Sequence, residues 1–114
     1  MLLEIVERQM EPDITVVELT GRLALGRESQ RIETLVDDLA RKGSLRVIFD
    51  LSGVDYIDSA GIGMVALASG KLKESGGTLA LVAPTGRVLD LLNLTQMNAI
   101  VKVCPTMDAA AAAV

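Results

Sequence analysis

Short apolar stretches separated by polar residues and turn signals divide the chain into strands and helices. Near the N-terminus, residues 3–7 and 14–19 are rich in β-branched side chains and predict two strands. Glu11-Pro12-Asp13 between them is typical of a turn. Because the two stretches are close in the chain, we expect them to pair antiparallel as a hairpin. Gly21-Arg22-Leu23 then ends the hairpin region.

The helices are indicated by apolar residues at helical spacing. Over residues 28–41, the i, i+3, i+4, i+7 positions are apolar, namely Ile32, Leu35, Val36 and Leu39. Gly43 ends this predicted helix. A second helix is expected from about Ala60 to Glu74 and a third over residues 86–94. A short C-terminal helix, capped by Thr106, should include the alanine tail, which we expect to be frayed.

Two continuous apolar runs, Val47–Phe49 and Leu79–Val82, are typical of strands buried on both faces. Ile100–Val103 is expected to form the last strand. The element order is therefore ββαβαβαβα, which predicts a single α/β domain over residues 1–114. Its sheet should be mixed but mostly parallel, with helices packed on it and with the Val47–Phe49 strand away from the edges.

Composition and charge exclude several classes of function. One Phe, one Tyr, no Trp and a net charge of −4 argue against nucleic-acid binding. The absence of histidine excludes a His-based catalytic triad, and with Cys104 as the one cysteine it excludes a His- or Cys-rich metal site. We expect no metal and no cofactor. No apolar run approaches the ~20 residues of a membrane span, and the N-terminus lacks a signal-peptide pattern, so we expect a cytoplasmic protein with no membrane insertion.

Polar residues concentrate after the Val47–Phe49 strand. Residues 50–63 hold three aspartates and two serines, are expected to form a loop, and lead directly into the second helix. Ligands and chemistry gather at the carboxyl ends of strands in such sheets. Asp50 and Asp58 could form an acid–base pair, but no histidine or nucleophile–base partner accompanies them. We therefore expect both aspartates to shape the loop by accepting hydrogen bonds from its backbone N–H groups, and we expect no enzymatic activity.

The same segment carries a family resemblance. Residues 47–52, followed by Tyr-Ile-Asp-Ser-Ala-Gly-Ile-Gly at 56–63, resemble the signature of the STAS family. The stretches 76–82 and 88–92 resemble it as well, so the resemblance covers nearly the whole chain. The Asp-Ser-x-Gly-x-Gly element is fairly specific between these flanks. One departure is Thr95-Gln96-Met97, where many relatives have Thr-Gly-Leu; it bears on the identity of the partner and leaves the fold intact.

The resemblance implies an anti-sigma-factor antagonist. In regulatory members of the family, the serine after the aspartate, here Ser59, is phosphorylated by the partner. That partner is an anti-sigma factor with a histidine-kinase-like ATPase fold that acts as a serine kinase. The unphosphorylated antagonist binds it and frees the sigma factor, and a phosphatase reverses the modification. The alternative is a STAS accessory subunit of a lipid-transport ATPase complex, which is not phosphorylated.

Ser59 is expected at, or next to, the N-cap of the second helix. A phosphate there would face the positive end of the helix dipole, so the modified domain could stay folded. It would add roughly −1.5 to −2 charges to a binding surface. The alternative for Ser59 is an ordinary helix cap.

The predicted partner-binding surface surrounds this serine. We expect Gly61 and Gly63 to keep it uncluttered, and Met64 and Leu67 to be largely exposed beside it, although exposed apolar side chains are also common without function. The core face of the helix should be Ile62, Val65, Ala66, Ser69 and Leu72. The full predicted partner-binding set is Asp58, Ser59, Ala60, Gly61, Ile62, Gly63, Met64 and Leu67.

Overall fold

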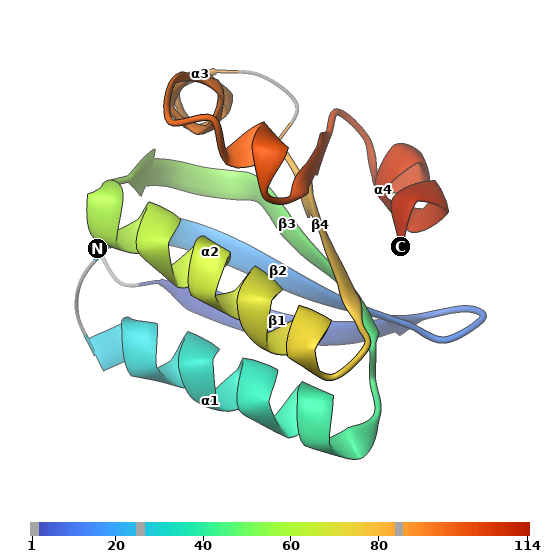
Figure 1. Cartoon of the computed structure of the whole chain (residues 1–114). Helices are drawn as coiled ribbons and strands as arrows, with labels where there is room; N and C mark the ends of the chain where they lie inside the picture. The colour runs from blue at the N-terminus through green and yellow to red at the C-terminus, as the bar shows by residue number, and fades with distance from the viewer. Residues whose placement is uncertain (1–2, 25–26, 84–85) are drawn as a thin grey trace.

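A computed structural model describes residues 3–24, 27–83 and 86–114, which build one five-stranded sheet with helices on both faces (Figure 1). The strands are β1 (Glu4–Met10), β2 (Ile14–Leu23), β3 (Arg46–Ile57), β4 (Thr78–Val82) and β5 (Lys102–Cys104). The helices are α1 (Arg27–Lys42), α2 (Ser59–Glu74), α3 (Arg87–Leu94), the 3-10 turn η1 (Met97–Ala99) and α4 (Met107–Ala113). The predicted order of strands and α-helices is confirmed.

The sheet is mixed, as predicted. Its strand order is β1-β2-β3-β4-β5; β1 pairs antiparallel with β2, and every other neighbouring pair is parallel. The apolar run Val47–Phe49 lies in β3, at the centre of the sheet, where all three side chains are fully buried. A strand covered on both faces has no polar face, which explains its continuous apolar sequence.

The segment expected as a loop is largely strand, which corrects the sequence-based boundary. β3 continues to Ile57 and pairs with β2 as far as Leu23. The register between the two strands shifts near Glu18 and again near Gly21. Because of these irregularities, the buried residues in this part of β3 are three positions apart: Leu51, Val54 and Ile57. The alternation of buried and exposed side chains by which a strand is recognised in a sequence is therefore lost here. β5 also begins later than predicted, at Lys102.

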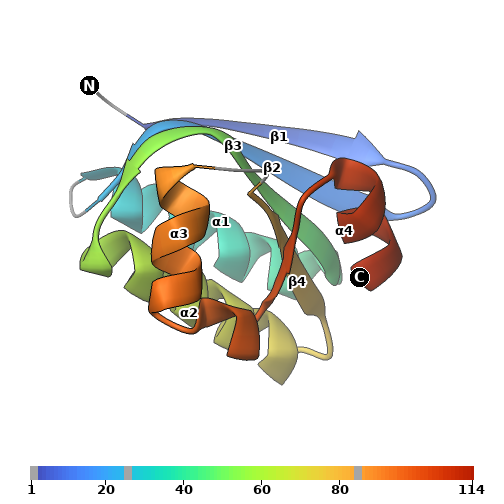
Figure 2. The ribbon, with the colours of Figure 1, turned by 90° about the horizontal axis from the view of Figure 1, so that it is seen from above.

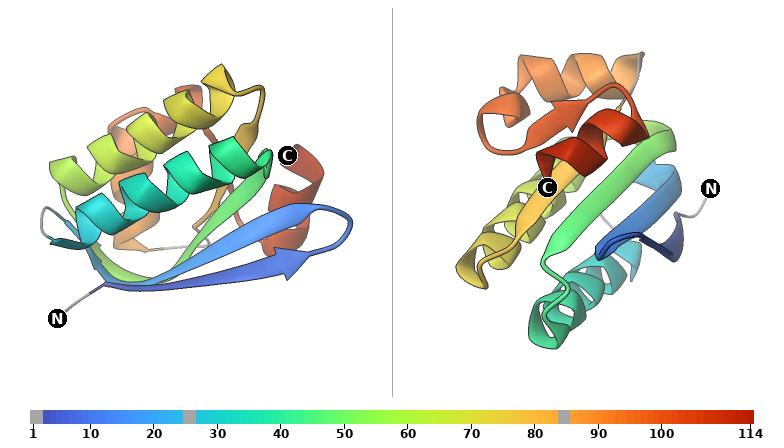
Figure 3. Two further views of the ribbon diagram at one scale, coloured as in Figure 1. Left: turned by 90° about the horizontal axis from the view of Figure 1, so that it is seen from below. Right: turned by 90° about the vertical axis from the view of Figure 1, so that its right-hand side faces the viewer.

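The main core lies between one face of the sheet and three helices. Helices α1 and α2 run side by side over this face, as Figures 1 and 3 show. The residues 28–41 and 60–74 are thus confirmed as covers of the sheet. Ile32, Val36 and Leu39 of α1 are buried against Phe49 and its neighbours, and α3 adds Leu92.

The opposite face of the sheet is covered by α4 (Figure 2). Thr106 caps this helix as predicted, because its Oγ1 accepts a hydrogen bond from the Ala109 backbone N–H at 3.1 Å. Ala110 is fully buried in a second cluster with Ile14, Ile48 and Cys104. The expectation of a frayed alanine tail is therefore wrong: small side chains let the helix pack closely on the strands.

Candidate functional site

The site begins where β3 ends and α2 starts. Asp58 is the N-cap of α2: its backbone is extended, and its Oδ1 accepts a hydrogen bond from the Gly61 N–H at 2.9 Å. Its carbonyl oxygen accepts from the Ile62 N–H at 3.0 Å. Because a carboxylate here satisfies an otherwise unpaired N–H and faces the helix dipole, Asp58 fixes the position at which the helix starts.

Ser59 is the first residue of α2 and is exposed. The structure thus places it next to the cap rather than at it, which is one of the two positions predicted. Since Asp58 supplies the capping oxygen, the helix start does not depend on the Ser59 hydroxyl. Removal of this hydroxyl would therefore take away no capping hydrogen bond.

Gly61 and Gly63 play different roles, although the sequence suggested the same role for both. A Cβ added to Gly61 would lie 2.1 Å from the backbone oxygen of Leu23. Gly61 is buried and lets the first turn of α2 rest directly on the end of β2, so the expectation that it keeps an exposed surface uncluttered is wrong. Gly63 is exposed, and an added Cβ would meet nothing within 4 Å.

The faces of α2 differ in part from the prediction. Val65, Ser69 and Leu72 are buried as expected, but Ala68 is buried too, while Ile62 and Ala66 are only half-buried. Met64, expected to be largely exposed, is half-buried against the main core. Leu67 is 50% exposed, as predicted. Helix α2 packs beside α1, and Met64 lies on the side of α2 that lines the groove between them. A helix that is apolar on several sides does not reveal from its sequence which side faces a neighbouring helix.

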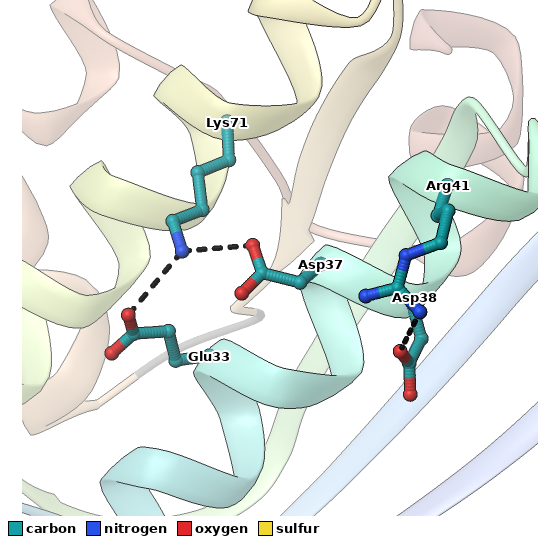
Figure 4. A network of polar contacts seen from close by, with 5 residues as sticks. All are labelled: Glu33, Asp37, Asp38, Arg41 and Lys71. Atoms are coloured by element: carbon teal, nitrogen blue, oxygen red, sulfur yellow. Dashed lines mark hydrogen bonds and ion pairs between the residues drawn. The ribbon is translucent and has the colours of Figure 1, made fainter.

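Met64 and Leu67 line a groove of about 160 Å³ between α1 and α2, with Ile32, Glu33, Val36, Ala68 and Lys71 as its other lining residues. Lys71 stands at this groove and joins the two helices (Figure 4): its Nζ lies 2.8 Å from Asp37 Oδ1 and 3.3 Å from Glu33 Oε1. The hydrogen bond to Asp37, together with Glu33, raises the pKa of Lys71 above its usual 10.5. The lysine is therefore charged at neutral pH and holds α2 against α1.

The two aspartates shape backbone, as predicted. Asp50 Oδ1 accepts a hydrogen bond from the Ser52 N–H at 2.9 Å, and Asp58 caps α2. Asp50 lies within β3 and Asp58 just beyond its end, so the extended strand separates them by on the order of 20 Å. They cannot share a proton or a substrate atom, which removes the acid–base pair. Within residues 3–24, 27–83 and 86–114, no His, Cys, Asp or Glu group is arranged to hold a metal ion, and no helix is long and apolar enough to cross a membrane.

A second recess, which the sequence did not indicate, lies between the end of β3 and α3. Its volume is about 270 Å³, and it is lined by Tyr56, Ile57, Arg87, Val88, Asp90, Leu91 and Leu94. The Arg22 guanidinium lies 4.0 Å from the centre of the Tyr56 ring. Residues about thirty positions apart form this recess, so no local pattern could have revealed it.

Known proteins resemble this chain in sequence. A Thermotoga maritima protein named as an anti-sigma factor antagonist is 35% identical over 74 residues, which cover 65% of this chain and 66%, just under two thirds, of that protein. The Bordetella bronchiseptica protein BtrV, whose name places it in the same class, is 35% identical over 88 residues, covering 75% of this chain and 76% of BtrV.

Solved structures share the fold. The crystal structure of TM1081 from Thermotoga maritima superposes with a TM-score of 0.85 at 26% identity, covering 96% of this chain and 93% of that one. The unphosphorylated form of the anti-sigma factor antagonist SpoIIAA superposes with a TM-score of 0.74 at 16% identity, covering 96% of each chain. Its phosphorylated form from Bacillus gives 0.71 at 17% identity, covering 94% of this chain and 96% of that one.

The family model of the STAS domain matches residues 6–110, from the first strand to the terminal helix. This range includes most of β1, all of β2, the capped start of α2 and the first part of α4, the helix that covers the far face of the sheet. The chain therefore belongs to the STAS domain family.

Proposed function

We propose that this protein is an anti-sigma-factor antagonist whose binding to its partner is switched by phosphorylation of Ser59. The partner is an anti-sigma factor with a histidine-kinase-like ATPase fold that acts as a serine kinase, and a serine phosphatase restores the unmodified form. The protein is a binding module of the cytoplasm rather than an enzyme. Sequence relatives named as anti-sigma factor antagonists and the shared fold of SpoIIAA support this proposal.

The observation that carries the proposal is the exposed position of Ser59 beside a separate cap. Phosphoryl transfer would form a bond between Ser59 Oγ and the γ-phosphorus of ATP, release ADP and liberate the hydroxyl proton. The product phosphate would lie at the N-terminus of α2, where unpaired N–H groups and the helix dipole favour negative charge. Asp58 already occupies the cap, so its carboxylate would repel the phosphate and limit this gain. The domain can accept the modification without losing the helix.

The partner-binding surface in this proposal is the exposed stripe that begins at Ser59. Gly63 and Leu67 follow at intervals of four residues and share this side of α2. A glycine within an exposed helix lowers stability by about 1 kcal/mol relative to alanine. Gly63 bears this cost although its surroundings leave room for a methyl group, which favours close approach of a partner backbone there.

The apolar groove beside this stripe supplies a place for a partner side chain. Leu67 and Met64 line it, and the remaining members of the surface, Asp58, Ala60 and Ile62, are half-buried around the first turn. Gly61 supports the surface from below. A phosphate at such an interface would lose its bound water and would add up to two negative charges to the interface. If this makes the free energy of binding less favourable by ~3 kcal/mol, the affinity falls by roughly a hundredfold.

Phosphorylation is tested with the kinase-type anti-sigma factors of the native host. Each is purified and incubated with the domain and ATP, and the mass of the domain is measured. We expect one added phosphate, located at Ser59 by peptide mass spectrometry. Ser59→Ala should accept none, whereas Ser52→Ala, a matched change at another exposed serine, should accept one. Full modification of Ser59→Ala would rule out this acceptor, and no modification by any of these kinases would favour the lipid-transport subunit.

Binding is tested by calorimetric titration against the anti-sigma factor that modifies the domain. Ser59→Asp should bind more weakly than the wild type, and less weakly than the phosphorylated form because it carries less charge. Gly63→Ala should also weaken binding, because its methyl group enters the contact. Gly70→Ala is the matched control: Gly70 is equally open, seven residues further along α2. Equal binding by the wild type, Ser59→Asp and Gly63→Ala would place the partner elsewhere.

A further inference from the structure

Among the residues that the structure describes, no strand pairs with the outer edge of β1, which is the longer of the two edges of the sheet. The edge at β5 is short, with three residues, whereas β1 has seven. Most side chains of β1 are exposed, and Val6 near its middle is 50% exposed. An edge strand offers outward N–H and C=O groups that can pair with another strand. Figure 2 shows β1 along the outer side of the sheet.

The side chains of β1 divide cleanly between the two faces. Ile5 packs against the main core, on the face that α1 and α2 cover. Arg8 bonds to Glu18 of β2, with Nη2 and Oε2 2.8 Å apart, and Val6 pairs directly with Glu18. Because side chains alternate along a strand, Glu4, Val6 and Arg8 share the opposite face.

We propose that β1 pairs antiparallel with β1 of a second copy of this chain, in the register that sets Val6 opposite Val6. A two-fold axis perpendicular to the sheet relates the two copies and joins their sheets into one of ten strands. In this register Glu4 lies opposite Arg8 of the second copy, and Arg8 lies opposite its Glu4. Two opposite-charge pairs then flank a pair of β-branched side chains, both of which stabilise antiparallel strands.

The charge pattern selects this register over its neighbours. In antiparallel strands, side chains directly opposite each other point to the same side of the sheet. The possible registers therefore differ only by shifts that keep each side chain on its own side. A shift in one direction sets Ile5 opposite Ile5 and Glu4 opposite Val6, so Glu4 gains no arginine partner. Shifts in the other direction set Glu7 opposite Glu7 and then Arg8 opposite Arg8, which places like charges together at the two-fold axis. The Val6-centred register is thus the one of these four that sets Glu4 opposite Arg8.

The test is sedimentation equilibrium on the full chain from about 10 µM to about 1 mM, a range suited to a small interface. We expect the wild type to form dimers. Glu4→Arg places two arginines at each charged pair and should raise the dissociation constant at least about tenfold, as should Arg8→Glu, which places two glutamates there. An equimolar mixture of these two variants restores both opposite-charge pairs and should form heterodimers. Circular dichroism confirms that each variant is folded.

Glu74→Arg is the matched control, because it changes the net charge by the same amount at the exposed end of α2. It should dimerise as the wild type does. Its heterodimer with Arg8→Glu keeps one opposite-charge pair but also places two glutamates together, so it should form more weakly than the heterodimer of Glu4→Arg with Arg8→Glu. A wild type that stays monomeric throughout the range would overturn the proposal. So would dimers whose dissociation constant is unchanged by Glu4→Arg, or a mixture that associates no better than its separate components. The test does not involve Ser59 and stands apart from the proposed function.

Discussion

The first turn of α2 lies so close to β2 that a Cβ on Gly61 would come 2.1 Å from the carbonyl oxygen of Leu23. Two residues away, the same helix leaves Gly63 open to solvent. We predict that Gly61→Ala lowers the free energy of unfolding by about 3 kcal/mol or more, because backbone must move. Gly63→Ala should raise it by about 1 kcal/mol. Urea unfolding measures both, and a stability gain for Gly61→Ala would contradict the packing described.

Two substitutions of Asp58 should distinguish the stability that comes from its capping hydrogen bond from the stability that comes from its negative charge. Asp58→Ala removes the oxygen that accepts from the Gly61 N–H and should lower the free energy of unfolding by about 1 kcal/mol. Asp58→Asn keeps an acceptor and should retain most of the stability. Thermal unfolding monitored by circular dichroism distinguishes the two. Equal melting temperatures for Asp58→Ala and the wild type would show that the cap contributes nothing.

Substitutions of Met64 and Leu67 should have different effects: the first should lower the stability of the fold, and the second should weaken binding to the partner. Met64 is half-buried against the core, so Met64→Ala should lower the free energy of unfolding by about 2 kcal/mol. Leu67 is half-exposed, and Leu67→Ala should change it by less than about 0.5 kcal/mol while weakening partner binding. Denaturant unfolding, run beside the binding titration, gives both quantities. A large stability loss for Leu67→Ala would place it in the core.

Gln96 has a left-handed backbone, with φ 60° and ψ 31°, at the turn between α3 and η1. This conformation costs a residue with a side chain about 1 kcal/mol relative to glycine. Gln96→Gly should therefore raise the free energy of unfolding by about that amount, and Gln96→Val, whose Cβ is branched, should lower it. Chemical denaturation of the three proteins is the measurement. The same stability for Gln96→Val and Gln96→Gly would argue against strain at this turn.

The ion pairs of Lys71 should contribute to the free energy of unfolding at neutral pH, and this contribution should disappear at high pH. Folding raises the pKa of Lys71, chiefly through its hydrogen bond to Asp37. A group whose pKa is higher in the folded state stabilises it fully below the unfolded pKa and loses that effect as the pH rises through the folded pKa. The stability difference between the wild type and Lys71→Gln should thus hold at neutral pH and shrink above about pH 10.5. Urea unfolding of both proteins at a series of pH values measures this difference. A difference that grows as the pH rises would contradict the prediction.

Local sequence patterns were sufficient to predict most of the fold. The spacing of Ile32, Val36 and Leu39 predicted α1, and the apolar run Val47–Phe49 predicted a central strand. Thr106 marked the start of α4. Each of these signals depends on chemistry within one or two turns of helix or one strand, so it can be read without knowing the neighbours.

Contacts between distant segments decided what the sequence left open. β3 extends to Ile57 because β2 continues beside it, and the register shifts between them hide the strand pattern. Met64 is half-buried because α1 packs beside α2, which no periodicity within α2 could show.

The candidate site divides in the same way. The sequence by itself determined that Asp58 and Ser59 stand at the start of a helix, because a capping residue and the serine after it are local features. Only the tertiary structure decided that Gly61 is buried and Gly63 is open. The reason is physical: both glycines are equally compatible with a helix, and it is the position of Leu23, nearly forty residues earlier, that forbids a side chain at one of them.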